Sequence, residues 1–514
     1  MKKIYLIAAL AIGLLMTSCS DLDEKILNEQ DNSSLITDTK NAAQLAAPAY
    51  ASLRNMMDDN GMWLVTEVST DECCYPTRGS DWNDANNRAV FEHTYDSENL
   101  KVRGAWNNLM EGITYCNVGL NYLGNLEQTD EVKAFTNEVK FIRALHMFYL
   151  TNYFGHFPMR ESNETDYKAK PQILDRTAAT ERIISELNEI IPNLKQKGEV
   201  PYGRVTKAAA QQLLAHVYLD YQIFTGSSDA KWDNVISICD EVIKSGKYRL
   251  ADDIWKLYLS DNQSYADQTE AVLPIVYDQK AGIAGRSWLN FTLHYNMTFN
   301  NFTSFWNGAC TTEDFLDRWD PTDPRYSDNR LRAETGFNLG IIEGQQYTID
   351  GTPETTRNGQ PLVFTRDFSV ENSNEAQGVR IVRYAPDPNY AYGSGSDNDV
   401  MFFRYSDFYL MRGEAKLRKG DTAGALEDIN TIRKARGVKE LTASELTLDK
   451  FFAERGFEFY WDGAWSRDDA VRFGHYCEAR QNVKACDETR ILLPIPNTAI
   501  EANSDLKQNP GYTK

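Results

Sequence analysis

The stretch FRYSDFYLMRGEAKLRKGDTAGALEDINTIRKARG, residues 403–437, predicts two amphipathic helices that pack against each other. They meet at the turn Gly420-Asp421, because glycine and aspartate favour a chain reversal over continued helix. Ala415 and Ala425 are small enough to let the two helices approach closely. A helical hairpin of this kind cannot bury its apolar face alone, so it must pack against further hairpins.

Other segments share this pattern, most strongly 130–154, where apolar residues recur at three- and four-residue steps. We expect four helical hairpins, discontinuous in sequence, stacked as a right-handed scaffold that resembles tetratricopeptide repeats, although the repeat consensus is only partly met. The fold class is therefore mainly α. The predicted helices cover about 41–57, 102–124, 130–154, 178–196, 206–224, 231–246, 404–419 and 422–436.

The middle of the chain, about 255–400, is rich in Pro, Gly, Asn, Asp and aromatic residues and has little helical period. It contains the short strand-like runs QPLVFTRDF and GVRIVRY, at 360–368 and 378–384. A structureless loop of this length is implausible inside a compact domain, so we expect a loop-rich lobe with short strands and helices over the scaffold. Loops on a rigid frame are also where function is usually carried. The predicted domain spans 41–514, with the scaffold mainly at 41–250 and 400–440, the lobe at about 255–400 and a C-terminal segment at 440–514.

The N-terminus, MKKIYLIAALAIGLLMTSC, has the features of a sorting signal. Two lysines precede the apolar run Ile4 to Met16, which is too short to span a bilayer as a mature helix. Small polar residues then lead to Cys19, an arrangement that resembles a bacterial lipobox. We expect a signal peptide at 1–18, a lipidated Cys19 and a polar, acidic tether at 19–40; an ordinary secretory signal with an incidental cysteine is the alternative.

Composition narrows the class of protein. The 514 residues exceed what one hydrophobic core usually supports, so more than one lobe is expected. The net charge is −20 and no basic run follows the first residues, which argues against a nucleic-acid partner. Aromatic residues make up 12% of the chain, and such rings suit the flat faces of sugars.

Eight cysteines are present, but no CxxC motif and no Cys/His spacing typical of a zinc site. We therefore name no metal ligand and no cofactor. Cys477 and Cys486 could bridge a small loop in an oxidising compartment, although sequence alone leaves the connectivity open. The adjacent Cys73 and Cys74 are more typical of small buried residues than of a strained disulfide.

Five motifs stand out in the chain: STDECCYPTRGSDW (69–82), VKFIRALHMFYLTNYFGHFP (139–158), FRYSDFYLMRGEAKLRKGD (403–421), ERGFEFYWDGAWSRDDAVRFG (454–474) and LLPIPNTAIEANSDLKQNPGY (492–512). Together and in this order they resemble the SusD-like (RagB/SusD) family of surface glycan-binding lipoproteins. The chain departs from the family pattern in two places. Ala85-Asn86-Asn87 stands where many relatives carry a Gly-rich turn, and Asp462-Gly463-Ala464-Trp465 replaces the commoner Glu-Gly-His-Arg type.

The resemblance implies a non-catalytic protein on the outer-membrane surface of a Bacteroidetes-type bacterium. Such a protein would capture a polysaccharide or oligosaccharide and deliver it to a SusC-type TonB-dependent transporter. Binding in this family is dominated by aromatic platforms.

Candidate platforms follow from the chemistry of sugars, because the C–H face of a pyranose stacks on an indole while its hydroxyls seek polar partners. Trp82 lies in the polar, turn-rich loop PTRGSDWNDANN (76–87), and Trp306 lies in the stretch FWNG. Trp288 and Tyr392 are further candidates. Each ring has a plainer explanation: Trp82 could anchor its own loop, and Trp306 and Trp288 could pack at a lobe junction. Tyr392 lies in the stretch NYAYGSGSD, which could close on a ligand or simply be a disordered loop.

Hydrogen-bonding candidates are Asp71, Arg78, Asn83 and Arg380, because charge-assisted hydrogen bonds survive competition from water. In its strand-like run, Arg380 should face away from its apolar neighbours. Structural ion pairs are the alternative explanation for these residues. The other tryptophans are expected in the core, with Trp461 and Trp465 sharing a helical segment with Phe457 and Phe459; the remainder are Trp63, Trp106, Trp232, Trp255 and Trp319.

Two other classes of function remain. A glycosidase needs two suitably spaced carboxylates, and with 74 acidic residues their presence alone indicates nothing. Motifs such as GxSxG, HExxH, GxxxxGK[ST] and GxGxxG are missing, and we name no catalytic residue. The third class is an interaction subunit that assembles with the transporter and has little glycan affinity of its own, since hairpin stacks commonly mediate protein contacts.

Overall fold

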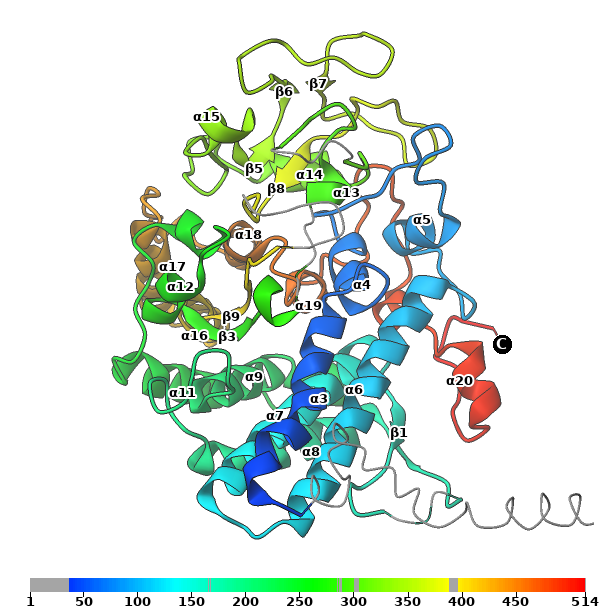
Figure 1. Ribbon diagram of the computed structural model, residues 1–514, viewed down its shortest axis with the longest axis vertical. Coiled ribbons are helices and arrows are strands. Elements are labelled where there is room, and N and C mark those ends of the chain that lie inside the picture. Colours follow the sequence, from blue (N-terminus) through cyan, green and yellow to red (C-terminus); the bar gives the residue numbers. More distant parts are fainter. Residues whose placement is uncertain are drawn as a thin grey trace, which may run out of the picture.

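The computed structural model describes residues 37–513 apart from 165, 167, 284, 286–288, 300–304 and 388–395. The predicted signal peptide, Cys19 and most of the predicted tether therefore lie outside the described residues. Helices dominate the fold and strands are few and short, which confirms the predicted mainly α class (Figure 1). Among the described helices, none combines the length and apolar character needed to cross a membrane.

Eight helices form the scaffold, and each packs against the next in chain order. The predicted ranges are confirmed to within a few residues at each end, with two exceptions. The range 206–224 contains two helices that meet at Asp220, the second being the short α10 (Tyr221–Thr225). The range 178–196 ends in a 3-10 turn, η2 (Ile191–Asn193). The scaffold helices are α3 (Ala42–Met56), α6 (Leu100–Asn125), α7 (Asp130–Tyr153), α8 (Arg176–Ile190), α9 (Lys207–Leu219), α11 (Trp232–Lys244), α16 (Ser406–Arg418) and α17 (Thr422–Ala435).

Local chemistry sets where these helices begin and how closely they pack. The side chains of Thr129, Asp175 and Asp421 accept hydrogen bonds from backbone N–H groups of the first turns of α7, α8 and α17, which satisfies donors that have no partner within the helix. Between α16 and α17, Gly420 adopts φ 87°, a conformation that glycine reaches without steric cost. Ala415 and Ala425 are fully buried, as the close approach of these helices requires.

The loop-rich lobe contains most of the strands, all in antiparallel pairs. β3 (Ala271–Ile275) pairs with β9 (Val400–Arg404), and a three-stranded sheet has the order β4-β5-β8. The predicted runs at 360–368 and 378–384 contain β7 and β8, respectively. The remaining strands are β1 (Phe157–Met159), β2 (Gln172–Leu174), β4 (Ser327–Asp328), β5 (Leu339–Ile342), β6 (Gly344–Gln345), β7 (Val363–Phe364) and β8 (Arg380–Val382).

Several shorter helices escaped the sequence prediction, because a helix of one or two turns carries too little periodicity to stand out. In Figure 1 the lobe helices α13, α14 and α15 lie near β5 and β8, above the scaffold, and α4 and α5 lie beside the upper part of α6. The shorter helices are α4 (Met62–Val68), α5 (Ala85–Glu92), α12 (Gln263–Gln268), α13 (Leu289–Thr292), α14 (Glu313–Asp317), α15 (Arg332–Thr335), α19 (Ser466–Arg472) and α20 (Asn497–Ala502). The longer α18 (Leu448–Phe459) contains Phe457 and Phe459, whose segment was predicted to be helical.

One helical prediction was wrong. Trp461 and Trp465 do not continue the helix of Phe459, because α18 ends there and Trp461 adopts φ 61°. The turn that follows passes so close to Trp63 that a Cβ on Gly463 would lie 2.4 Å from the indole ring. The predicted core position of Trp461 and Trp465 is nevertheless confirmed, because both side chains are buried. Of the other tryptophans, Trp63, Trp106, Trp255 and Trp319 are buried and Trp232 is half-buried.

A network of buried charges joins the scaffold to the lobe. The fully buried Glu458 of α18 accepts from Arg325 Nη1 at 3.1 Å, Arg404 Nη1 at 2.8 Å and Arg436 Nη2 at 2.6 Å. The carboxylate of Glu270 pairs with the same two guanidinium groups, at 3.1 Å from Arg404 Nη1 and 2.7 Å from Arg436 Nη2. Although burial opposes ionisation, these guanidinium groups hold the pKa of Glu458 well below its ordinary range.

Replacing Glu458 with glutamine should therefore leave three guanidinium groups short of compensating charge and lower the free energy of unfolding by about 3–5 kcal/mol. Because the native pKa of Glu458 lies below its ordinary value of 4.5, the difference from wild type should be full at neutral pH and shrink below pH 4.5. Urea unfolding at several pH values measures both effects. The matched control is Asp505→Asn, which removes an exposed pair with Lys170 and should cost less than about 1 kcal/mol. Equal losses in the two variants would contradict the expectation.

Candidate functional site

Two chain segments far apart in sequence are joined beneath the predicted aromatic platform. Cys74 N–H donates to the Cys310 carbonyl at 2.7 Å, and Cys310 N–H donates back to the Cys74 carbonyl at 2.8 Å. Trp82 follows the first segment and Trp306 precedes the second. The pairing brings the two indoles to a centroid distance of 6.4 Å with a tilt of 44°.

Trp82 is held firmly within this aromatic cluster. Its Nε1–H donates to the Trp306 carbonyl at 2.6 Å, and its ring stacks on the buried Tyr75 at 4.9 Å. The Phe291 ring meets the indole in an edge-to-face arrangement with a centroid distance of 6.0 Å, and a Cβ on Gly308 would lie 2.4 Å from the indole. Trp82 thus anchors its own loop, as the alternative explanation proposed, while remaining half-exposed. Trp306 is the more open ring, with 38% of its surface exposed.

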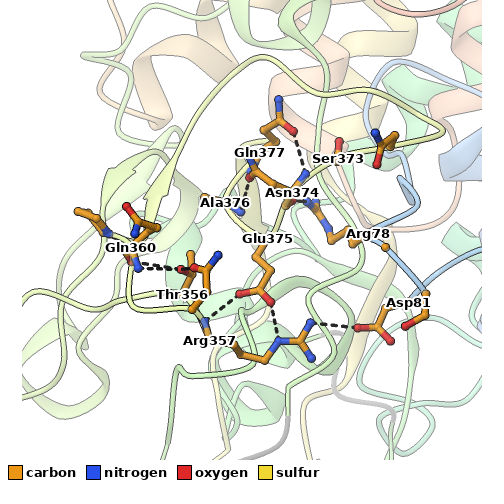
Figure 2. Close-up of a pocket in the computed structure, with 15 residues that line it drawn as sticks. Arg78, Asp81, Thr356, Arg357, Gln360, Ser373, Asn374, Glu375, Ala376 and Gln377 are labelled. Carbon is orange, nitrogen blue, oxygen red and sulfur yellow. Dashed lines mark hydrogen bonds and ion pairs between the residues drawn. The ribbon is translucent and has the colours of Figure 1, made fainter.

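A polar pocket of about 820 Å³ is lined in part by the turn that directly precedes Trp82, although neither indole is among its lining residues (Figure 2). Three loops form its walls: the turn 78–81 that precedes Trp82, the segment 356–361 and the segment 372–377. Arg78, Asp81, Arg357 and Glu375 supply its charged groups, two of each sign. A concave site with converging hydrogen-bonding groups beside exposed rings is suited to a polar ligand that has one apolar face.

Arg357 links the walls of the pocket. Figure 2 shows its guanidinium between the two acidic side chains: Nε donates to Glu375 Oε1 at 2.5 Å and Nη2 to Asp81 Oδ2 at 3.3 Å. The same guanidinium lies 3.8 Å from the ring centroid of Tyr295, whose hydroxyl donates to Asp81 at 2.7 Å. One face of Tyr295 is therefore covered by Arg357 rather than open to a ligand.

The electrostatics of this pocket favour stable charges over proton transfer. Burial opposes ionisation of Glu375, but hydrogen bonds from Arg357 N–H, the Arg357 side chain and His294 hold its pKa below the ordinary value. Burial lowers the pKa of His294 to about 4, so this imidazole is neutral at physiological pH. Burial also raises the pKa of Tyr295, and its hydroxyl remains a hydrogen-bond donor.

The two candidate arginines hold backbone in place. Arg78 donates to the carbonyls of Asn374 at 2.6 Å and Gly308 at 3.4 Å, and it lines the pocket although it is 97% buried. Arg380 is fully buried and donates to Asn307 Oδ1 at 2.8 Å and to the Gln377 carbonyl at 2.9 Å. Within the described part of the chain neither guanidinium forms an ion pair. Burial lowers the pKa of both. A direct contact between Arg380 and a ligand would require loss of these bonds.

The remaining candidates lie elsewhere. Asp71 is bound by Arg318 in a separate groove, with Nη1–Oδ2 and Nη2–Oδ1 distances of 2.5 and 3.1 Å, which matches the structural ion pair given as its alternative. Asn83 is exposed, and its Oδ1 accepts from Arg88 at 2.9 Å. Trp288 and Tyr392 lie outside the described residues, so their predicted roles stay predictions.

The sequence did not identify Arg357, Asn374 or Glu375. They lie in turns without periodicity, and only the three-dimensional path of the chain brings them to Arg78 and Asp81. The polar cluster ENSNEAQ directly before the run GVRIVRY was the one available signal. Across the described residues, no three His, Cys, Asp or Glu side chains are grouped so that they could hold a metal ion.

The fold and the pocket together define a class: a helical-hairpin scaffold whose loop-rich lobe carries an aromatic and polar candidate site. Two family descriptions match the chain, "SusD family" over residues 251–485 and "Starch-binding associating with outer membrane" over residues 25–219. A curated relative, the starch-binding protein SusD of Bacteroides thetaiotaomicron, is 26% identical over 99% of this chain and 98% of its own length.

Solved structures share the fold. A SusD superfamily protein from Parabacteroides distasonis gives a TM-score of 0.72 at 21% identity, covering 92% of this chain and 99% of that one. Surface glycan-binding protein A from Bacteroides thetaiotaomicron, solved in complex with laminarihexaose, gives 0.68 at 19% identity, covering 92% and 99%. The two family matches, over residues 25–219 and 251–485, and the full-length relative establish that the chain belongs to the SusD-like family.

Replacing Gly308 with alanine tests how tightly Trp82 is placed. The new methyl group would lie 2.4 Å from the Trp82 ring and 2.9 Å from the Phe291 carbonyl, so the indole must move. We expect a changed near-UV circular dichroism spectrum and a loss of about 1–3 kcal/mol in the free energy of unfolding. Gly124→Ala is the matched control, because nothing lies within 4 Å of the added atom. An unchanged spectrum in Gly308→Ala would show that the ring is not confined as described.

Proposed function

We propose that this protein binds a polysaccharide or oligosaccharide at the outer surface of the outer membrane without cleaving it. The observation that carries the proposal is the half-exposed pair Trp82 and Trp306 beside a polar pocket of about 820 Å³. The indole faces suit the C–H face of a sugar, and the pocket loops supply donors and acceptors for its hydroxyls. The names of the relatives, which refer to starch and laminarihexaose, support the same class of ligand.

The charges around the pocket favour an uncharged sugar. Arg78 and Arg357 are balanced by Asp81 and Glu375, and Arg357 contacts both carboxylates. A ligand with its own carboxylate or sulfate would have to compete with these acidic groups. We therefore expect neutral glycans to bind in preference to uronate-rich ones.

The same carboxylates are poorly suited to glycoside hydrolysis. Such an enzyme needs a carboxylic acid whose pKa is raised so that it can protonate the leaving group. Glu375 has the opposite tendency, since hydrogen bonds to Arg357 lower its pKa. Within the pocket this supports a binding function over the glycosidase alternative.

We also propose that Cys19 carries lipid and that the protein works with a SusC-type TonB-dependent transporter. The surface feature that supports a protein partner is a row of exposed apolar side chains on α6. Tyr115, Val118 and Tyr122 follow one another at helical spacing and are 38%, 48% and 36% exposed. A contiguous apolar face on a helical scaffold is typical of an interaction surface.

Glycan binding should depend on both tryptophans, but for different reasons. Trp306→Ala should weaken binding roughly tenfold, equivalent to about 1.4 kcal/mol, with little effect on stability because the ring is exposed. Trp82→Ala should weaken binding and also lower stability by about 2 kcal/mol, because its ring packs on Tyr75 and Phe291. Affinity electrophoresis through gels containing starch, laminarin and other plant and host polysaccharides measures binding.

The control for these variants is Tyr122→Ala, an exposed ring on α6, which should leave the electrophoretic retardation unchanged. Retardation that survives both tryptophan variants would remove the platform from this site. The absence of retardation by every glycan would favour the assembly-subunit alternative, and release of reducing sugar would overturn the non-enzymatic proposal.

Partner binding should depend on α6 and not on the pocket. Val118→Asp places a charge in the exposed apolar row and should reduce co-purification of a TonB-dependent transporter from outer membranes at least tenfold, while glycan retardation is unchanged. Ile349→Asp is the matched control, since this side chain is 62% exposed but lies in the lobe. Equal co-purification by Val118→Asp and wild type would exclude this face as the transporter contact.

A further inference from the structure

Cys477 and Cys486 lie at the base of a short loop, CEARQNVKAC. Cys486 N–H donates to the Cys477 carbonyl at 2.9 Å, and further up the loop Arg480 and Val483 exchange backbone hydrogen bonds of 3.0 and 2.8 Å. The two cysteines are therefore fixed opposite each other. Both are half-buried thiols, whereas the other five described cysteines are fully buried.

The two thiols contact each other and a histidine. The Cys477 thiol is a hydrogen-bond partner of Cys486, whose Sγ lies 3.4 Å from His93 Nδ1. His93 Nε2 lies 2.7 Å from the Ser69 carbonyl, so Nε2 carries the ring proton and Nδ1 is free to accept one from the thiol. The hydrogen bond from the Cys477 thiol, together with the contact to His93, lowers the pKa of Cys486 to about 5, and Arg480 contributes in the same direction.

The loop between these cysteines forms hydrogen bonds to two parts of the molecule, the segment 69–91 and the lobe. Arg480 Nη2 donates to the Phe91 carbonyl at 2.6 Å and to the Ser69 carbonyl at 3.2 Å, at the start of the segment that leads to Trp82. Gln481 accepts from Glu313 N–H at 2.8 Å and Asn482 donates to the Phe368 carbonyl at 2.9 Å, both in the lobe. Closing the base of the loop would hold these contacts in register.

We propose that Cys477 and Cys486 form a disulfide in the exported protein, which braces the loop 477–486 against the scaffold and the lobe. The reaction is thiol–disulfide exchange with a protein disulfide donor of the compartment outside the cytoplasm. The Cys486 thiolate attacks one donor sulfur, giving a mixed disulfide and one donor thiolate. The Cys477 thiolate then attacks Cys486 Sγ, forms the new S–S bond and releases the second donor thiolate. The two cysteines are oxidised, the donor disulfide is reduced to two thiols, and the two protons pass to the donor.

A second pair of cysteines in contact is closed to solvent and therefore to an oxidant. The thiols of Cys74 and Cys310 also interact, but both side chains are fully buried, so an oxidant cannot reach them in the folded protein. Cys477 and Cys486 are half-exposed, and Cys486 is the more nucleophilic of the two. The inference requires export but does not depend on glycan binding, so the two proposals can fail separately.

Peptide mapping tests the bond directly. The chain from Ser20 onward, which includes all of the described fold, is produced with a cleavable export signal and alkylated under denaturing conditions without reductant. Trypsin should then yield FGHYCEAR (473–480) linked to ACDETR (485–490), with the intervening QNVK (481–484) released. The linked pair should disappear when reductant precedes alkylation. The same chain made in the cytoplasm is the control and should show both peptides alkylated. Alkylation of Cys477 and Cys486 in the exported protein without reductant would overturn the proposal, as would a link from either one to another cysteine.

A melting experiment tests the bracing role. Reductant should lower the thermal transition of the exported wild-type protein by a few degrees, because the reduced loop gains conformational freedom in the unfolded chain. The double variant Cys477→Ser/Cys486→Ser should melt near the reduced wild type and should not respond to reductant. A wild-type transition that reductant leaves unchanged would show that the loop gains nothing from the bond.

Discussion

The carboxylate of Glu458 is the point at which distant parts of this chain are joined by charge. Three guanidinium groups converge on it: one from the lobe, one from the end of β9 and one from the end of α17. A buried charge costs several kcal/mol to desolvate, and only a complete set of partners offsets that cost. The network is therefore favourable only when scaffold and lobe are correctly placed together. It specifies their arrangement where apolar contacts alone would tolerate sliding, and it makes the loop-rich lobe part of a rigid frame.

The binding pocket depends on this frame because its residues come from three separate loops. The backbone pairing of Cys74 with Cys310 fixes the distance between the two platform rings, and Arg78 and Arg380 hold the carbonyls of neighbouring loops. Such buried guanidinium groups act through backbone position, so the polar groups that face a ligand are arranged before it binds. A site organised in advance loses less conformational entropy on binding, which matters where each sugar hydroxyl gains little over water.

The sequence was sufficient for the scaffold and for part of the site. Long helices were recognisable because apolar periodicity persists over several turns, and turn residues such as Gly420 marked their ends. Trp82 and Trp306 were recognisable because a large ring in a polar loop has no obvious core to fill. The pocket residues Arg357 and Glu375 were not, because they approach Asp81 only through the tertiary path of turns that carry no periodic signal. Closeness in sequence can also mislead. Asp71 lies near Trp82 in the chain, yet its carboxylate is bound by Arg318 in another groove.

The positions of the proposed surfaces also constrain how they could work together. In Figure 1 the helix α3, with which the scaffold starts, begins near the bottom of the molecule, where α6 also ends, whereas β6 and β7, which flank the pocket segment 356–361, lie at the top. The proposed lipid anchor precedes α3 and so joins the described fold at this lower end. A sugar bound at the pocket and a partner bound along the lower part of α6 would therefore contact different ends of the molecule. Because the buried charges join lobe and scaffold, a tilt of the scaffold against a partner would carry the pocket with it, and transfer by such a rigid-body movement fits this architecture better than transfer along the surface of the protein.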